Sequence, residues 1–376
     1  LPMTDRVVPP KKPLTSREIT VQLSLKKFLI PAIIVCAAIA AALLIWQLLP
    51  KKSAQKTSIA VISFENQTGQ SSYDYLRKAI PNLLITNLER SKKIEVLTWE
   101  RMHDLLAQIG KPELELIDRD VGFELCRREG VDALVVGSFI MAGDMFATDV
   151  KILDVSTKSI LKSASSKGDG ISSILKTQID ELSREISKGI GLPSVTPQSG
   201  GRGIADVTTD SMEAYEQFLE GKDSYEKFYF EEAKQHFLKA VELDPRFSTA
   251  YFYLGETHFE QGERDSGIAA YQKAHEFSDK ATEKEKLFIE AEYVSWIEGD
   301  RERRFQLLQE LVKKYPKEKQ ALFELAMVYN NREMYQEAID LFSRAVALDP
   351  NWDQPVNMLA YLYSDLGDYD KALEYL

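Results

Sequence analysis

The second half of the chain repeats with a period near 34 residues, and this period constrains the fold more than any other feature. "KAVELDP" ends at Pro245 and "RAVALDP" at Pro350, while "LVKKYP" ends at Pro316 and "KAHEFSD" takes the same place at Asp279. These four ends are 34, 37 and 34 residues apart. Each period predicts two helices, and the prolines end the second one. One such unit cannot bury its apolar face alone, so the units must stack.

Small residues mark the places where the two helices of a unit must touch. They are Gly221, Gly255, Ala326 and Ala360 in the first helices, and Ala233, Gly267, Ala338 and Ala372 in the second. The third unit departs from this pattern, because Glu292 and Arg304 take the two places. A 34-residue period of paired helices resembles the tetratricopeptide repeat. The resemblance predicts an α-solenoid over residues 211–376, in five units: 214–247, 248–281, 285–318, 319–352 and 353–376.

The two ends of the sequence are unusual. The last unit stops within its second helix, with no polar capping helix after it, and the first residue is not methionine. A terminal repeat is normally capped. We therefore expect this chain to be an excerpt of a longer protein.

Residues 28–49 carry no charge in 22 residues and are flanked by lysines on both sides. Because about 20 apolar residues cross a bilayer core, this segment predicts a single transmembrane helix in contact with lipid. A signal peptide is disfavoured, since the apolar run is too long and no small-residue cleavage site follows. The basic excess in the juxtamembrane linker, residues 1–27, predicts that residues 57–376 are extracytoplasmic.

Charge is distributed unevenly along the chain. Residues 1–56 contain nine Lys/Arg and two Asp/Glu, whereas the remainder contains 38 basic and 56 acidic residues. An acidic body argues against a nucleic-acid partner, because phosphate binding requires clustered cations. Cys36 lies in the apolar segment and Cys126 in a charged helix, so a disulfide between them is not expected.

Residues 57–192 have the pattern of an α/β domain. Apolar runs predict strands at 58–64 and 94–99 and three further strands within 133–165. Helical spacing predicts helices at 74–90, 100–110, 118–129 and 171–189. The stretches "IAVISFENQTGQ", "VDALVVGSFIMAGD" and "VKILDVSTKSIL" in this order resemble the TolB-like amino-terminal domain, which implies a non-enzymatic module. The linker to the repeats is placed at residues 193–210, rich in Pro, Ser and Gly.

No motif in the chain predicts catalysis, a cofactor or a metal. "FENQTGQ" lacks the glycines and the lysine of phosphate-binding loops, so an ordinary strand-to-helix turn is expected. His103, His236, His258 and His275 form no zinc-binding pattern. Nucleophile signatures are also absent from the sequence.

The resemblance to tetratricopeptide repeats implies a groove lined by the first helices. In this family, positions 2, 5, 9 and 12 of each first helix line the groove. The predicted groove residues that would bind a partner are Phe218, Tyr225, Phe252, Phe259, Tyr293, Trp296, Phe323 and Tyr361, with Tyr215, Ile289 and Met327 beside them. Each could instead belong to the core between repeats, but together they predict a groove for a peptide or helix. Only Lys222 and Lys286 are basic at these positions, which disfavours acidic tails as the ligand.

The order of segments resembles the carboxy-terminal portion of bacterial membrane-anchored serine/threonine kinases. "PLTSREITVQLSLKKFLIPA", "DSMEAYEQFLEGKDSY" and "ATEKEKLFIEAEYVSW" carry this resemblance. It implies a kinase domain upstream, since this chain has no kinase motif. The predicted function is a non-catalytic sensory or protein-interaction region. The alternatives are the equivalent region of a membrane-anchored winged-helix transcription regulator and a stand-alone envelope scaffold.

Overall fold

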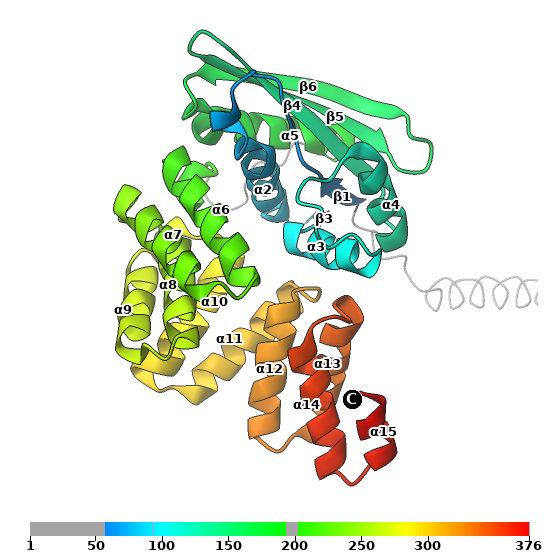
Figure 1. The fold of residues 1–376 in the computed structure, drawn as a ribbon, viewed down its shortest axis with the longest axis vertical. Helices are drawn as coiled ribbons and strands as arrows, with labels where there is room; N and C mark the ends of the chain where they lie inside the picture. The colour runs from blue at the N-terminus through cyan, green and yellow to red at the C-terminus, as the bar shows by residue number, and fades with distance from the viewer. Residues whose placement is uncertain (1–56, 92, 193–201, 376) are drawn as a thin grey trace, which may run out of the picture. The chain divides into compact units, whose positions relative to one another are not determined.

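The computed structural model describes residues 57–91, 93–192 and 202–375. All of them belong to one compact unit, residues 56–376. In chain order this unit contains a small sheet domain and then a series of paired helices, which Figure 1 traces from blue to red.

The predicted fold class requires a correction. Within the described ranges no helix is long and apolar enough to cross a membrane. The longest there, α6 (Met212–Glu226), has 15 residues, whereas a span needs about 20. The predicted span at 28–49 and its contact with lipid lie outside the described residues. The fold is therefore a mostly helical solenoid with a small sheet domain, and the transmembrane helix is removed from the fold class.

The sheet domain contains strands in the order β3-β1-β4-β5-β6. Its strands are β1 (Thr57–Val61), β2 (Glu65–Asn66), β3 (Ile94–Leu97), β4 (Ala133–Ala142), β5 (Met145–Asp154) and β6 (Ile160–Asp169). β1 pairs in parallel with β3 and β4, whereas β4, β5 and β6 pair antiparallel. The short β2 pairs with β4. This mixture reflects the connections, because parallel neighbours need a crossover helix and antiparallel neighbours need only a tight turn.

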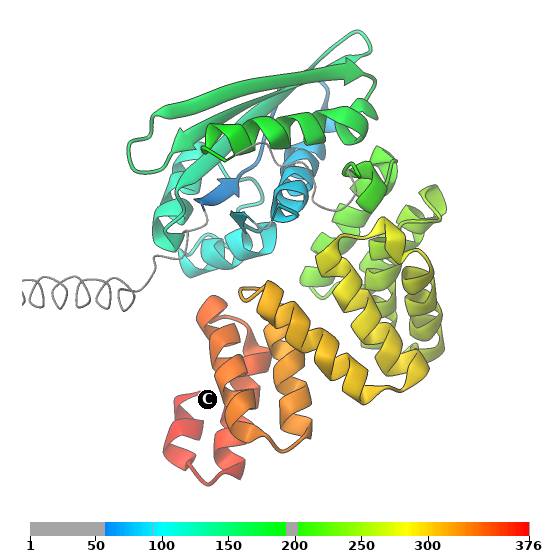
Figure 2. The same ribbon diagram turned by 180° about the vertical axis from the view of Figure 1, so that it is seen from behind.

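Helices pack against this sheet. They are α2 (Leu76–Glu89), α3 (Trp99–Gln108), α4 (Arg119–Glu129) and α5 (Ile179–Gly189), with a π-helical turn, η2 (Ile174–Gln178), before α5. Thr148 of β5 donates a buried hydrogen bond of 2.8 Å to Gln178, and Figure 2 shows α5 along the sheet from behind. The predicted order of strands and helices is confirmed.

Ten helices follow in five pairs among the described residues. They are α6, α7 (Phe230–Leu243), α8 (Ser248–Glu260), α9 (Arg264–Glu276), α10 (Glu283–Tyr293), α11 (Arg301–Lys314), α12 (Lys319–Asn331), α13 (Tyr335–Leu348), α14 (Asp353–Asp365) and α15 (Tyr369–Glu374). Thr282 and Glu285 form a capping box at the start of α10, which fixes where the third pair begins.

Glycine allows the close helix contacts that the sequence pattern predicted. A Cβ atom at Gly221 would lie 2.6 Å from the ring of Phe237, and one at Gly255 would lie 2.6 Å from the ring of Tyr271. Both distances are shorter than any ordinary carbon contact, so only glycine leaves room for these rings.

The third pair replaces small residues with an ion pair. Arg304 of α11 lies 2.9 Å from the carboxylate of Glu292 in α10 and 2.8 Å from that of Glu324 in α12. A π-helical turn, η5 (Val294–Glu298), extends α10. The two residues that departed from the pattern therefore bind each other, and they link the third repeat to the fourth.

The carboxy-terminal end of the predicted linker is packed. Ile204 and Val207 are buried in the core. The Ile204 backbone N–H donates to the Asp180 carboxylate at 3.2 Å, and the Thr209 hydroxyl donates to Asp244 at 2.6 Å. The chain is thus attached to α5 on one side and to the first repeat on the other, while residues 193–201 lie outside the described ranges.

We expect Gly255→Ala to destabilise the repeats. The added methyl group must displace the Tyr271 ring, and overpacking of this kind costs about 1–3 kcal/mol. Urea unfolding followed by circular dichroism measures the change. Glu232→Ala, at an exposed position of α7, is the control and should change the free energy of unfolding by less than about 0.5 kcal/mol. Equal stabilities for the two variants would contradict the close contact.

Candidate functional site

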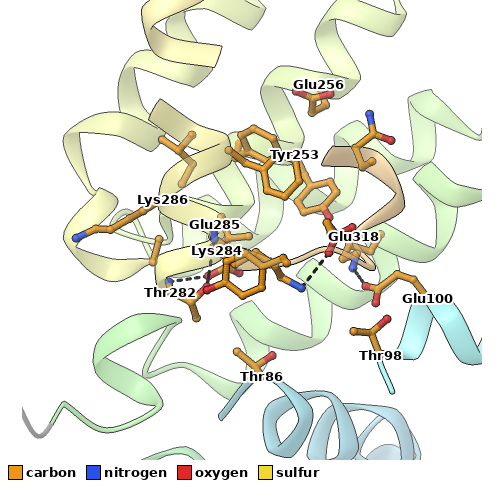
Figure 3. Close-up of a pocket in the computed structure, with 18 of the residues that line it drawn as sticks. Thr86, Thr98, Glu100, Tyr253, Glu256, Thr282, Lys284, Glu285, Lys286 and Glu318 are labelled. Atoms are coloured by element: carbon orange, nitrogen blue, oxygen red, sulfur yellow. Dashed lines mark hydrogen bonds and ion pairs between the residues drawn. The ribbon is translucent and has the colours of Figure 1, made fainter. Parts of the chain in front are cut away.

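A cavity of about 980 Å³ lies against the first helices of the repeats. Its wall is formed by residues of α6, α8, α10 and α12 together with residues of α2 and α3 (Figure 3). We call it the repeat cavity. Because it is lined by the helices that the sequence predicted for the groove, it is the candidate site.

Lysines occupy one end of the repeat cavity, and carboxylates of the sheet domain neutralise them. Lys222 of α6 lies 2.5 Å from Glu100 of α3. Lys284 of α10 lies 3.3 Å from Glu89 of α2 and 3.1 Å from Glu318. Figure 3 shows Lys284 directed at Glu318, with Glu100 close by. This group of residues is called the lysine end.

Lys319 completes the lysine end. Its ammonium group lies 2.7 Å from Asp104 of α3 and 2.6 Å from Asp349, which follows α13. Burial raises the pKa of Asp104 to about 6, although Lys319 acts in the opposite direction. Burial also raises the pKa of Glu100, but Lys222 and Lys284 outweigh it and hold that pKa well below its ordinary value. The pKa values of Asp104 and Glu100 are thus shifted in opposite directions, and the strength of the neighbouring lysines relative to burial sets the direction.

Carboxylates dominate the other end of the repeat cavity. Glu256 of α8, Glu292 and Glu324 line it, and Arg304 lies between the last two. The Tyr271 hydroxyl donates a hydrogen bond to Glu256. Burial, followed by the charge of Glu292, raises the pKa of Glu256 to about 8. These residues are called the acidic end, and Figure 3 shows Glu256 apart from Lys284 and Glu100.

Five of the eight predicted groove residues line the repeat cavity: Phe218, Tyr225, Phe252, Phe259 and Trp296. Tyr215 and Ile289 line it as well. Phe218 is also a core residue, because it is buried and its ring centroid lies 5.0 Å from that of Phe247. Its side chain therefore supports the fold of the first two repeats and contributes little free surface.

Trp296 joins the second and third repeats. Its ring stacks on Phe259 with centroids 4.4 Å apart, and the Arg264 guanidinium lies 4.7 Å from the ring centre. The indole N–H donates to Glu292 at 3.2 Å. Trp296 is half-buried: one part of its ring packs against other side chains and another part is exposed.

The other three predicted groove residues lie elsewhere. Tyr293 stacks on His275 with ring centroids 3.7 Å apart. Phe323 packs between Phe342 and Trp352, beside the second hydrophobic core. Tyr361 is 67% exposed. None of the three lines the repeat cavity.

Several charged residues of the site were not predicted from the sequence. They are Lys284, Lys319, Glu256 and Glu324. Arg304 was noted only for its place in the repeat pattern and also lines the cavity. A signal existed, because Lys284 and Lys319 are 35 residues apart, close to one repeat. Among the described residues, no group of three or more His, Cys, Asp or Glu side chains could hold a metal ion.

Comparison with protein families identifies the repeats. Residues 306–351 and 355–376 match tetratricopeptide repeat models. The carboxy-terminal region consists of tetratricopeptide repeats. Such repeats mediate protein–protein or peptide interactions and are generally non-catalytic. Residues 221–295 match a further model, "Regulator of microtubule dynamics protein 1-3". No curated protein matches the chain.

Several solved structures are similar to part of the chain. The crystal structure of MamA is 20% identical, with 41% of this chain and 89% of that one covered and a TM-score of 0.29. "YrrB: a TPR protein with an unusual peptide-binding site" is 20% identical, with coverages of 43% and 82% and a TM-score of 0.29. The Pseudomonas aeruginosa pilF structure is 20% identical, with coverages of 43% and 73% and a TM-score of 0.33.

Proposed function

We propose that this chain is a non-catalytic interaction region whose repeat cavity binds a peptide or helix of a protein partner. The observation that carries the proposal is the repeat cavity itself, formed by the first helices of successive repeats. Its volume lies at the upper end of the range for ligand pockets, about 300–1,000 Å³. Such a volume accommodates several side chains of a peptide.

The lining of the repeat cavity supports a peptide as the ligand. Aromatic rings of Tyr225, Phe252 and Phe259 offer apolar area, and charged groups lie at both ends. Interfaces commonly combine aromatic anchors with polar groups that fix the orientation of the partner. A ligand of mixed character, such as a peptide, is suited to this wall.

The sequence resemblance supports a finer proposal. It favours a bacterial serine/threonine kinase as the parent protein, with a winged-helix regulator and an envelope scaffold as the alternatives. The coding sequence upstream of residue 1 tests this directly, since kinase motifs or a helix-turn-helix pattern would each select one reading. The TolB-like character of residues 57–192 and the extracytoplasmic location of residues 57–376 stay predictions.

Filling the repeat cavity should abolish peptide binding. Ser295 is half-buried in the cavity wall, so Ser295→Tyr places a ring in the space proposed for the ligand. Random 12-residue peptides displayed on phage are selected on the full chain, and the binders are measured by fluorescence polarisation. We expect affinity to fall at least about tenfold in the variant.

The control is Ser364→Tyr, at an exposed position of α14 that does not line the repeat cavity. It should bind the selected peptides as the parent chain does. Thermal melts establish that both variants are folded. Peptides that bind Ser295→Tyr and the parent equally would exclude the repeat cavity as their site.

A further inference from the structure

The two ends of the repeat cavity differ in whether their charges are already neutralised. At the lysine end, each of Lys222, Lys284 and Lys319 has at least one carboxylate within 3.3 Å. An acidic ligand would have to break these ion pairs before it could bind there. The ion pairs within the chain therefore disfavour an acidic ligand at the lysine end.

The acidic end, in contrast, has more carboxyl groups than cations. The guanidinium of Arg304 pairs with Glu292 and Glu324, whereas Glu256 lines the same end without a cation beside it among the described residues. Glu256 forms no ion pair within the described ranges, and the one hydrogen bond to its carboxyl group there comes from the neutral hydroxyl of Tyr271. Glu256 is half-buried, and ionising its carboxyl group without a counter-charge is costly, so a cation brought by a ligand would stabilise the ionised form.

A second polar group in the same wall also lacks a partner. Thr249, near the start of α8, is only 3% exposed, and its hydroxyl has no hydrogen-bond partner among the described residues. Thr249 lines the repeat cavity about two helical turns before Glu256 on α8. Buried polar groups in folded proteins are nearly always hydrogen-bonded, so this hydroxyl is an independent indication that a polar ligand completes the wall.

We propose that the acidic end of the repeat cavity binds the ammonium or guanidinium group of a basic side chain in the partner peptide, with Glu256 and Glu324 as its carboxylate partners. This inference rests on the proposed function and specifies the chemistry of the ligand. Phe259 and Trp296 flank the acidic end and would contact the hydrocarbon part of a lysine or arginine.

The neighbours of Glu256 give this binding a distinct pH dependence. The groups that face it are Tyr271 of α9, Glu292 of α10, Glu324 of α12, Glu260 of its own helix and Tyr225 of α6. Burial and these carboxylates raise the pKa of Glu256 to about 8. A bound cation favours the ionised carboxylate, so binding should release a proton and tighten as pH rises from 6 to 8.

The selected phage-display peptides provide the probe. We expect the peptides whose binding is lost in Ser295→Tyr to contain a lysine or arginine. Replacement of that residue by norleucine should weaken binding by about thirtyfold or more. Glu256→Gln in the full chain should cause a similar loss and should remove the tightening between pH 6 and 8. Glu232→Gln, on the exposed surface of α7, is the matched control and should change neither.

The outcomes separate this inference from the proposed function. Binders that depend on the cavity but contain no basic residue, or that bind Glu256→Gln as tightly as the parent, would overturn the inference and leave the proposed function standing. An absence of any cavity-dependent binder would overturn both. Calorimetry in buffers of different ionisation enthalpy adds a direct measurement of the released proton, and its absence at pH 7 would also count against Glu256.

Discussion

Lys319→Met is expected to lower the free energy of unfolding by about 3–5 kcal/mol. The lysine neutralises Asp104 and Asp349, whose side chains are only 13% and 10% exposed. Without it, two carboxylates remain buried with no counter-charge. Such an uncompensated buried charge is the reason that removing one partner of a buried ion pair is strongly destabilising. Methionine keeps most of the hydrocarbon packing, so the loss reports the charge. Urea unfolding at pH 7, followed by circular dichroism, measures it.

The pH dependence of this variant has a defined sign. Burial raises the pKa of Asp104 to about 6 in the folded chain, whereas the pKa of an unfolded aspartate is near 3.9. Protonation of Asp104 therefore stabilises the folded chain at low pH, and this stabilisation is lost as the pH rises through 6. Removing Lys319 raises that pKa further. We therefore expect the deficit of the variant to be smaller at pH 5, where the Asp104 carboxyl group is protonated, than above pH 7.

Two further variants make the Lys319 prediction sharp. Adding Asp104→Asn to Lys319→Met should restore part of the stability, because an amide carries no charge that requires neutralisation. Lys313→Met, at an exposed position of α11, should lie within about 0.5 kcal/mol of the parent. A decrease in the free energy of unfolding of less than about 1 kcal/mol for Lys319→Met would show that water solvates the two carboxylates well enough to replace the lysine.

Arg304→Ala is expected to have a comparable effect, about 3–5 kcal/mol. The arginine lies between Glu292 and Glu324, and it joins the third repeat to the fourth. Burial, followed by the charge of Glu292, already raises the pKa of Glu324. Loss of the guanidinium would raise this pKa further, so the deficit should shrink as pH falls from 7 to 5. Thermal and urea unfolding of the full chain measure it.

The repeat pattern supplies the matched rescue. Glu292→Ala together with Arg304→Ala restores small residues at both places, as Ala326 and Ala338 have them in the fourth repeat. The double variant should be more stable than Arg304→Ala alone, because one unpaired carboxylate has been removed. Arg301→Ala, at an exposed position of α11, is the control. A double variant less stable than the single one would mean that Glu292 stabilises the repeat without Arg304.

The local features of the repeats could be predicted because they recur. Small residues at Gly221 and Gly255 indicated close helix contacts, and the structure places the rings of Phe237 and Tyr271 against them. The order of strands and helices in residues 57–192 followed from apolar periodicity. The groove was predicted less well, since position in a helix does not decide whether a ring such as Phe323 packs in the core or lines a cavity.

The charge pattern of the site depended on the tertiary structure. Sequence reasoning gave Lys222 as a groove residue, but its partner Glu100 is 122 residues away. Lys284 and Glu89 are 195 residues apart, and Lys319 and Asp104 are 215 apart. No periodic signal connects such pairs, because they join repeats to helices of a different domain.

By itself, the sequence determined the helix pairs, their period and the α/β pattern of residues 57–192, since these depend on hydrophobic spacing, glycine and proline within short segments. Only the tertiary structure decided which charges in the repeat cavity are neutralised and which are free. Charge pairing acts through distance in space, and the fold brings carboxylates of α2 and α3 to the lysines while leaving Glu256 without a counter-charge among the described residues.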